Sequence, residues 1–304
     1  MKIGLVFAGQ GSQYVSMGQE FYDNYDTVKA IYDNVTLDFD IKTLCFKGPT
    51  TTLNDTAYAQ PCILLTSSAI ASLIKEHNIN ISYLCGLSLG EYSALVYSDC
   101  LSLQDGLDIV RYRGQIMSEA LNPETSGMYA VLNVDINVIE AYCQQTGCYV
   151  ANYNCPGQTV VSGYKENLDR FIQLLQDNNY RKPIALNVSG AFHTPLLEDA
   201  SNKLVTYLSK YNFDEPNIPI IFNINAKEEC SDLINNLGSQ IKSSVYFHQS
   251  IEYMIANDVD TIIEVGPGNV LSKFIRKINR DIKVYSIDSV QSFIEMLGEI
   301  NNGT

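Results

Sequence analysis

The stretch Gly86–Glu91, with the sequence GLSLGE, contains residues that could carry out acyl transfer. It follows a short apolar run at 81–85 and opens a helical run at 91–96, so Ser88 is predicted at a strand-to-helix turn. In such a turn, a nucleophile elbow, glycines let backbone pack against backbone while the serine hydroxyl is exposed at a helix N-terminus. The free N–H groups of that helix end would stabilise an oxyanion. The spacing predicts a serine nucleophile, with an ordinary glycine-rich turn as the alternative.

A serine nucleophile needs a base, and the chain has three histidines. His77 lies in the polar end of a predicted helix, where it suits the helix dipole, and His248 begins a helix as a cap or surface residue. His193 lies in an irregular segment where two predicted modules meet and a cleft is expected. A packed interdomain histidine is the alternative. Because no Asp or Glu stands out as a third member, we predict a Ser88–His193 dyad whose imidazole is oriented by something other than a carboxylate.

The elements around these residues predict an α/β fold with an interrupted large domain. The large part, 1–124 and 191–304, is predicted as an α/β-hydrolase-like domain that carries the nucleophile elbow. Its predicted strands are 3–8, 81–85, 218–222, 261–265 and 283–287, and its predicted helices include 60–77, with Pro61 in the first turn, and 103–120, capped by Ser102.

A smaller module is predicted at 125–190, after the turn-rich break at 121–127. Its strands are expected at 128–134, 149–154, 159–163 and 183–188, with helices at 137–145 and 167–176. This βαββαβ order predicts an inserted ferredoxin-like subdomain. The loop Gly9–Gln13 follows the first strand of the large part; without G-K-[ST] it does not match a phosphate loop, but its free N–H groups could face the elbow.

Composition narrows the classes of function. The chain has 304 residues, 46% of them hydrophobic, and a formal net charge of −14, which argues against a nucleic-acid partner and an anionic membrane surface. Eight cysteines without C-x-x-C spacing favour reduced, buried thiols, so no metal site is expected. With no signal segment and no apolar run of about 20 residues, we expect a cytoplasmic protein outside the membrane, and a monomer.

Several motifs together resemble the malonyl-CoA:acyl carrier protein transacylases, over residues 1 to about 280. They are Gly9–Gln13, Gly86–Leu95, Arg113-Gly114, Ala191-Phe192-His193 and Glu264–Gly268. The resemblance implies that Ser88 attacks the malonyl thioester and that His193 is the base. It also implies that Gln240, through its segment's main-chain carbonyl, orients the histidine. The oxyanion donors implied are the main-chain N–H groups of Gln10 and Leu89.

The resemblance assigns substrate selection to Arg113 and Phe192. A guanidinium can hold the malonyl carboxylate in a bidentate manner; Arg113 matches the family's arginine, and Arg111, about 200° away around the helix, does not. A surface ion pair is the alternative for Arg113. Phe192 resembles the malonyl-selective members, so malonyl is expected over methylmalonyl. The chain departs from the family at Leu87, where histidine is common, and at Ala8, where proline is usual.

The function implied is a ping-pong transfer. Ser88 takes the malonyl group from malonyl-CoA, and the phosphopantetheine thiol of an acyl carrier protein then removes it, in fatty acid biosynthesis and without a tightly bound cofactor. A free-standing enzyme that loads polyketide carrier domains and an acyl-thioester hydrolase are the alternatives. Arg113 discriminates against the hydrolase, since it has no purpose toward a neutral acyl ester.

The net charge raises a difficulty, because acyl carrier proteins are typically acidic and would be repelled at long range. Docking would need local basic patches. Arg276 and Lys277, with Lys273 and Arg280, have the i, i+3, i+4, i+7 spacing of one helix face, and Arg181-Lys182 precede the strand that leads to His193. Both clusters are predicted to bind the carrier protein, and ordinary solvated charge is the alternative.

Overall fold

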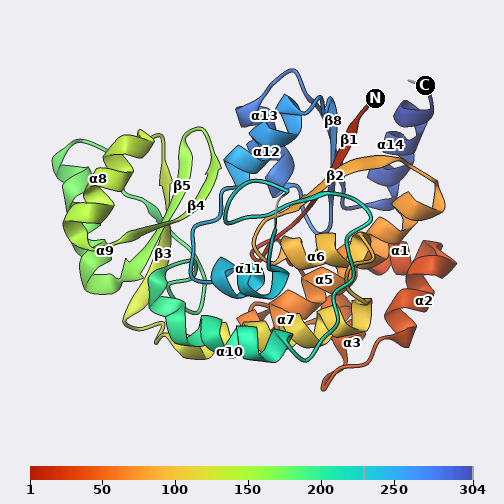
Figure 1. The fold of residues 1–304 in the computed structure, drawn as a ribbon, viewed down its shortest axis with the longest axis horizontal. Coiled ribbons are helices and arrows are strands. Elements are labelled where there is room, and N and C mark those ends of the chain that lie inside the picture. The colour runs from red at the N-terminus through yellow and green to blue at the C-terminus, as the bar shows by residue number, and fades with distance from the viewer. Residues whose placement is uncertain (229, 303–304) are drawn as a thin grey trace.

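The computed structural model describes residues 1–228 and 230–302, and its strands form two separate sheets (Figure 1). The first sheet has the order β7-β2-β1-β8-β9, and every neighbouring pair is parallel. Its strands are β1 (Ile3–Phe7), β2 (Ile81–Gly86), β7 (Ile220–Ile221), β8 (Thr261–Val265) and β9 (Lys283–Ile287). The predicted strands are confirmed, although 218–222 shortens to the two residues of β7. Because the strands are parallel, their carboxyl ends meet at one edge, where ligand sites of such sheets lie.

Helices cover both faces of this parallel sheet. Leu5 and Phe7 of β1 pack into one apolar cluster with α5 (Thr56–Glu76), α6 (Gly90–Tyr97) and α7 (Leu103–Ala120). Val6 points the other way, into a cluster with α12 (Phe247–Ala256) and α13 (Val270–Ile278). Successive strand side chains face opposite sides, so a strand buried on both faces must be apolar at every position, as β1 is.

The long helices α5 and α7 are both as predicted, except for the position at which α5 begins. Ser102 caps α7 by accepting the N–H of Asp105, as predicted. In α5 the Asp55 side chain accepts the N–H of Ala57, so the helix begins at Thr56 and Pro61 lies inside it rather than in its first turn. By length and hydropathy α5 alone, within the described part of the chain, could cross a membrane, and 83% of its most apolar window is buried in the protein.

The second sheet is antiparallel, with the order β4-β5-β3-β6. Its strands are β3 (Ser126–Leu132), β4 (Tyr149–Cys155), β5 (Gln158–Tyr164) and β6 (Ile184–Ala185). Helices α8 (Ile136–Thr146) and α9 (Lys165–Asp177) cover one face through a separate apolar cluster that includes Val131, Val161 and Phe171. The βαββαβ order is as predicted.

Strand β6 is shorter than the predicted 183–188. Pro183 has no N–H to donate, and the Val188 N–H turns back onto the Leu186 carbonyl, so the pairing with β3 ends after Ile184, Ala185 and one further bond from the Leu186 N–H to Met128.

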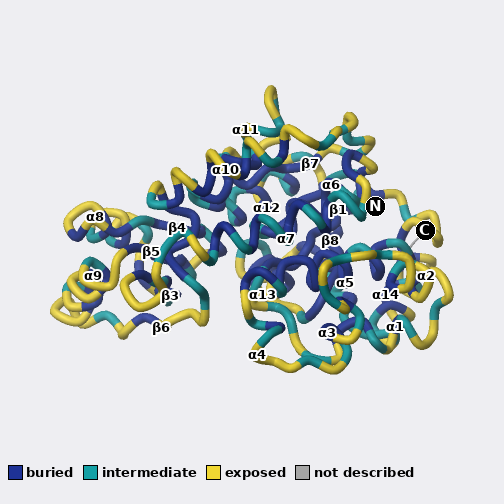
Figure 2. The backbone as a smooth tube through the Cα atoms, turned by 90° about the horizontal axis from the view of Figure 1, so that it is seen from below, coloured by how far each residue is buried: buried dark blue, intermediate teal, exposed yellow. Residues whose placement is uncertain are grey.

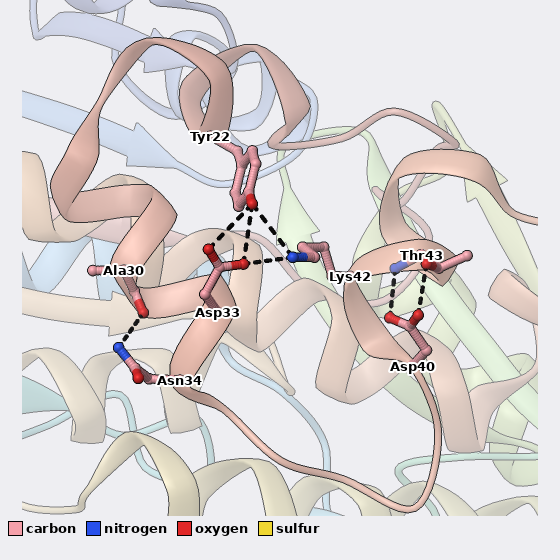
Figure 3. A network of polar contacts seen from close by, with 7 residues as sticks. All are labelled: Tyr22, Ala30, Asp33, Asn34, Asp40, Lys42 and Thr43. Atoms are coloured by element: carbon pink, nitrogen blue, oxygen red, sulfur yellow. Dashed lines mark hydrogen bonds and ion pairs between the residues drawn. The ribbon is translucent and has the colours of Figure 1, made fainter.

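The remaining helices surround the parallel sheet. They are α1 (Gln19–Asn24), α2 (Asp26–Asn34), α3 (Ile41–Lys47), α4 (Thr50–Leu53), α10 (Glu198–Leu208), α11 (Leu233–Gln240) and α14 (Val290–Asn302), with a 3₁₀ turn at Pro195–Leu197. Figure 3 shows Asp33 accepting hydrogen bonds from Tyr22 and Lys42, which links α1, α2 and α3. The exposed surface concentrates on the outer helices and the loops, while β1, β8 and α5 lie in the buried centre (Figure 2).

Candidate active site

A cleft of about 200 Å³ lies where the carboxyl edge of the parallel sheet meets the antiparallel sheet. Met128 and Ala130 of β3 face it, while their neighbour Val131 faces the helices α8 and α9. The parallel-sheet side contributes the loop after β1, the elbow and α7. The lining also includes Ser88, Arg113, Met117, Asn152, Asn154, Val160, Leu186, Phe192, His193 and Val270. The candidate residues that the sequence placed at the elbow, on α7 and at 192–193 therefore line one cavity.

Ser88 lies between β2 and α6 with a left-handed backbone, φ 54°. The two flanking glycines are required by close approach. A Cβ on Gly86 would lie 1.9 Å from the carbonyl carbon of Gly90, and a Cβ on Gly90 would lie 2.2 Å from the Phe7 oxygen. Any larger residue at either position would push the turn off β1, so the glycines permit the tight turn that exposes the Ser88 hydroxyl.

His193 lies next to that hydroxyl. Its Nε2 is 2.8 Å from Ser88 Oγ, and its Nδ1 is 2.9 Å from the main-chain oxygen of Gln240. A carbonyl can only accept, so Nδ1 carries the hydrogen and Nε2 is free to accept the Ser88 proton. Burial, and after it the charge of Arg113, lowers the pKa of His193 to about 4. The imidazole is therefore neutral at pH 7, as a base must be.

Arg113 is buried, with 1% of its surface exposed, and its guanidinium points at the nucleophile. Nη1 donates to Gln60 Oε1 at 2.7 Å, and Nη2 donates to Gln240 Oε1 at 2.8 Å and to Ser88 Oγ at 3.1 Å. The close approach of α7 to α5 depends on the next residue, because a Cβ on Gly114 would lie 2.6 Å from a main-chain oxygen of α5. Arg113 thus reaches the cleft from α7, which packs closely against α5.

The acceptors around Arg113 are neutral. Within the described ranges, no carboxylate lies within 4.0 Å of its guanidinium, although Glu91 is near enough to oppose the lowering of its pKa that burial causes. Arg111 differs: it points outward and forms an ion pair with Asp38 at 2.9 Å. A buried cation without an anionic partner is unfavourable, so this site would gain from a bound carboxylate.

Gln10 lines the cleft, and Leu89 directly follows Ser88 in the chain. Gln10 lies in the loop after β1, and its side chain is directed away, donating to Thr56 Oγ1 at 3.0 Å. Leu89 precedes the first residue of α6. Neither main-chain N–H has a hydrogen-bond partner among the residues that the structure describes, so both can donate to a ligand.

Phe192 and Leu87 form apolar walls of the cleft, and Ala8 lines it beside the Gly9 loop. Phe192 is buried directly beside His193 and lines the cleft. Leu87 contributes no polar group where the family commonly has histidine.

The predicted docking residues lie on the surface and outside the lining of the cleft. Lys273, Arg276 and Lys277 are exposed on α13, and Arg276 donates to the carbonyl of Val284 at 3.1 Å. The prediction that Arg280 continues this helix face is wrong, because α13 ends at Ile278 and residue 280 lies in the following turn. Arg181 and Lys182 are exposed just before β6, as expected.

Sequence reasoning gave no site role to three further residues. Gln60 holds Arg113 from α5, and a polar side chain within that apolar helix was the available signal. Glu91 belongs to the elbow motif, and its carboxylate accepts the N–H of Asn223 at 2.7 Å. Asn223 itself, 135 positions from Ser88, accepts the Ser88 N–H at 2.7 Å, and no local pattern marks it.

The other two histidines are remote from this pair. Nδ1 of His77 lies 2.9 Å from the Leu73 carbonyl at the end of α5, and His248 lies 3.3 Å from Glu252 on α12. Across the described residues, no three His, Cys, Asp or Glu side chains are grouped to hold a metal ion, and the eight cysteines are free.

Comparisons with known proteins identify the family of this chain. The acyl transferase domain family matches residues 5–293, so the protein is an acyltransferase. A malonyl CoA-acyl carrier protein transacylase of Staphylococcus aureus (strain MRSA252) is 37% identical over 299 residues, which are 95% of this chain and 96% of that protein. The chain belongs to the family of malonyl CoA-acyl carrier protein transacylases.

Solved structures of the family have the same fold. The crystal structure of malonyl CoA-acyl carrier protein transacylase from Clostridium perfringens superposes with a TM-score of 0.96 at 36% identity, covering 99% of this chain and 98% of that one. A malonyl-transacylase in complex with its type II PKS acyl-carrier protein superposes with a TM-score of 0.95 at 28% identity, covering 98% and 100%.

Proposed function

We propose that the protein transfers a malonyl group from malonyl-CoA to the phosphopantetheine thiol of an acyl carrier protein, in fatty acid synthesis. The observation that carries the proposal is the position of Ser88 Oγ, within hydrogen-bond distance of both a neutral imidazole nitrogen and a buried guanidinium. The first contact suits acyl transfer through serine. The second suits an acyl group that ends in a carboxylate.

In the first half-reaction His193 Nε2 removes the proton from Ser88 Oγ as the oxygen attacks the thioester carbonyl. The Nδ1–H, held by the Gln240 carbonyl, keeps the ring in the orientation and tautomer that this step requires. When the tetrahedral intermediate collapses, the C–S bond breaks and the imidazolium returns its proton to the leaving CoA thiolate. A malonyl ester on Ser88 remains.

The N–H groups of Gln10 and Leu89 are assigned to the oxyanion of that intermediate. Neither has a hydrogen-bond partner in the described part of the chain, and one lies after β1 and the other just before α6. Preorganised donors of this kind are worth about 3–4 kcal/mol each in serine enzymes. The strand-to-helix turn at Ser88 thus acts as a nucleophile elbow.

Arg113 is assigned to the malonyl carboxylate. Its guanidinium already has hydrogen bonds to Gln60 and Gln240, which fix its plane, and among the described residues it has no ion-pair partner that substrate would have to displace. A bound carboxylate would replace the contact with Ser88 Oγ and leave that hydroxyl to His193. Phe192 is assigned to the exclusion of methylmalonyl groups.

In the second half-reaction the carrier protein's thiol attacks the malonyl ester, and His193 accepts the thiol proton and returns it to Ser88. In both half-reactions groups of the chain transfer the proton and stabilise the charges. The proposal therefore includes malonyl-CoA as substrate and no tightly bound cofactor. Arg181, Lys182, Arg276 and Lys277 are assigned to the acidic carrier protein, because all are exposed.

The remaining assignments concern organisation. We propose a large hydrolase-like domain formed by 1–124 and 191–304, with a ferredoxin-like subdomain at 125–190; the order β4-β5-β3-β6 and its separate apolar cluster support this division. The protein is proposed to act as a cytoplasmic monomer, without nucleic acid or membrane, in keeping with a net charge of −14.

Intact-protein mass spectrometry tests the chemistry. Mixing with malonyl-CoA should add about 86 Da, the mass of a malonyl group replacing a hydroxyl hydrogen, and adding holo acyl carrier protein should remove it. Ser88→Ala should give no adduct. An adduct that persists in this variant, or that water removes as fast as the carrier protein, would contradict the proposal.

A further inference from the structure

Asn223 is completely buried at the start of the turn after β7, and all of its polar groups are hydrogen-bonded. Its side-chain Oδ1 accepts the N–H of Ser88, and its Nδ2 donates to the carbonyl of Gly86, both at 2.7 Å. Its main-chain carbonyl accepts the N–H of Tyr246, and its own N–H donates to Glu91. A reversed amide would lose both side-chain bonds, so the orientation is determined.

The two side-chain bonds reach both sides of the elbow. Strand β7 pairs with β2 only at Leu84 and Cys85, although β2 continues to Gly86. Beyond Cys85 the Asn223 side-chain amide takes the place of a main-chain partner, because it bonds to the Gly86 carbonyl and to the Ser88 N–H. A non-glycine residue with positive φ is strained and persists only when its surroundings hold it, so Ser88 needs such external bonds.

Glu91 links Asn223 to the helix that follows Ser88. It lies in the first turn of α6, three residues after Ser88, and Oε2 accepts the Asn223 N–H at 2.7 Å. Its side chain is fully buried, yet it has no ion pair in the described part of the chain, and Oε1 has no hydrogen bond. Burying a carboxylate this way is unfavourable, so an apolar residue would serve stability better.

We propose that Asn223 and Glu91 form a clamp that positions Ser88 for attack, with Glu91 holding Asn223 and Asn223 holding the elbow. This inference rests on the proposed function of Ser88. Neither residue touches the reacting atoms. They keep Ser88 Oγ at its hydrogen-bond distances from His193 and Arg113. For this the clamp requires a hydrogen-bond acceptor on the side chain of residue 91.

The test compares Asn223→Ala, Glu91→Met and Glu91→Gln in the full chain. Single-turnover malonylation of Ser88 by malonyl-CoA is followed by intact mass, and each rate is referred to the fraction of protein that finally becomes malonylated. Because a small displacement of a reacting group can cost about a hundredfold, we expect Asn223→Ala and Glu91→Met to react roughly ten- to a hundredfold more slowly at saturating malonyl-CoA. The half-saturating concentration should change less than about twofold, and Glu91→Gln, which keeps an acceptor, should stay within about threefold of wild type.

Tyr32→Phe is the matched control for stability. It removes the buried hydrogen bond between Tyr32 and Thr66, which joins α2 to α5 away from the cleft. Its melting temperature should fall while its malonylation rate stays at the wild-type value. The double variant Glu91→Met/Asn223→Ala should be no slower than Asn223→Ala alone, because the two residues act in series.

Wild-type rates in Asn223→Ala and Glu91→Met would overturn the clamp and leave the proposed function intact. So would losses that add in the double variant, or a rate loss in Tyr32→Phe as large as theirs. Absence of malonylation in the wild-type protein would instead overturn the proposed function and the clamp with it.

Discussion

Ser88 and His193, 105 positions apart, are joined at 2.8 Å and share an unusual backbone, since both have positive φ, 54° and 58°. Each is held in this conformation by contacts to distant segments. Asn223 accepts the Ser88 N–H, and the His193 N–H donates to the Ile241 carbonyl at 3.0 Å. Strain at both partners indicates a geometry maintained for chemistry at some expense of stability.

Replacing Arg113 with alanine should separate malonyl from acetyl transfer. Loss of a charge-assisted contact to the substrate carboxylate should cost about 2–4 kcal/mol in kcat/KM for malonyl-CoA. Turnover of acetyl-CoA, which has no carboxylate, should remain equal or improve. Arg111→Ala serves as the control, because that side chain pairs with Asp38 outside the cleft. Equal losses with both substrates would show that Arg113 has a structural role.

The rate of acylation should be insensitive to mild acid. His193 has a pKa of about 4, lowered mainly by burial and then by Arg113, so the base stays neutral well below the ordinary value of 6.5. We expect kcat/KM for malonyl-CoA to remain level from about pH 7.5 down to about pH 5.5, measured by a continuous CoA-release assay. A fall centred near pH 6.5 would mean that the imidazole is solvated as an ordinary histidine.

Glu91 should make stability depend on pH. Burial raises its pKa from 4.5 to about 7, despite the opposing effects of the Asn223 N–H and of Arg113. The folded state thus binds the proton more tightly than the unfolded state, so the contribution of Glu91 to the free energy of unfolding is fully present below about pH 4.5 and is lost as pH rises through about 7.

The loss attributable to Glu91 is at most about 3 kcal/mol. The other titratable groups that face it are Arg113 from α7, Tyr92 on α6, Cys85 of β2 and Cys230. Urea denaturation of wild type and Glu91→Gln at pH 5, 6 and 7.5 isolates its contribution, since only the wild type should lose this part. Parallel pH dependences would rule out a shifted pKa at Glu91.

Phe192→Ser should admit methylmalonyl-CoA. The Phe192 ring is buried beside His193 and faces the cleft, and one methyl group in an apolar pocket is worth about 1–3 kcal/mol. The ratio of kcat/KM for malonyl-CoA to that for methylmalonyl-CoA should therefore fall about tenfold or more. An unchanged ratio, with malonyl transfer intact, would place selectivity on another wall of the cleft.

Reversing Arg276 and Lys277 to glutamate should raise the apparent KM for the carrier protein several-fold at low salt, and less at high salt. The same reversal of Arg181 and Lys182 tests the second cluster. Lys203 and Lys210, exposed on and just after α10, provide a control with the same change in net charge. Malonylation by malonyl-CoA should be normal in all of them. If the control raises the KM equally, the effect comes from net charge and not from docking.

Local patterns in the sequence predicted the elements and the first half of the site. Short apolar and β-branched runs identified the strands, and helical periodicity identified the helix 103–120, because these patterns depend on neighbours in the chain. The elbow motif pointed to Ser88, and the scarcity of histidines left His193 as its partner. Helix periodicity also separated Arg113 from Arg111, since residues two apart lie on different faces.

Only the tertiary structure brought Gln60 and Asn223 to the nucleophile, and it added to Gln240, which the resemblance had implied, the side-chain bonds to Arg113 and to the Ser88 carbonyl. Gln60 lies 53 positions from Arg113, and the Gln240 amide donates to the Ser88 carbonyl from 152 positions away. Local periodicity shows that a residue is buried, but not which distant segment it will meet. Which segments meet is decided when helices cover both faces of the parallel sheet and the strand ends come together at one edge. There, polar side chains from distant segments complete each other's hydrogen bonds.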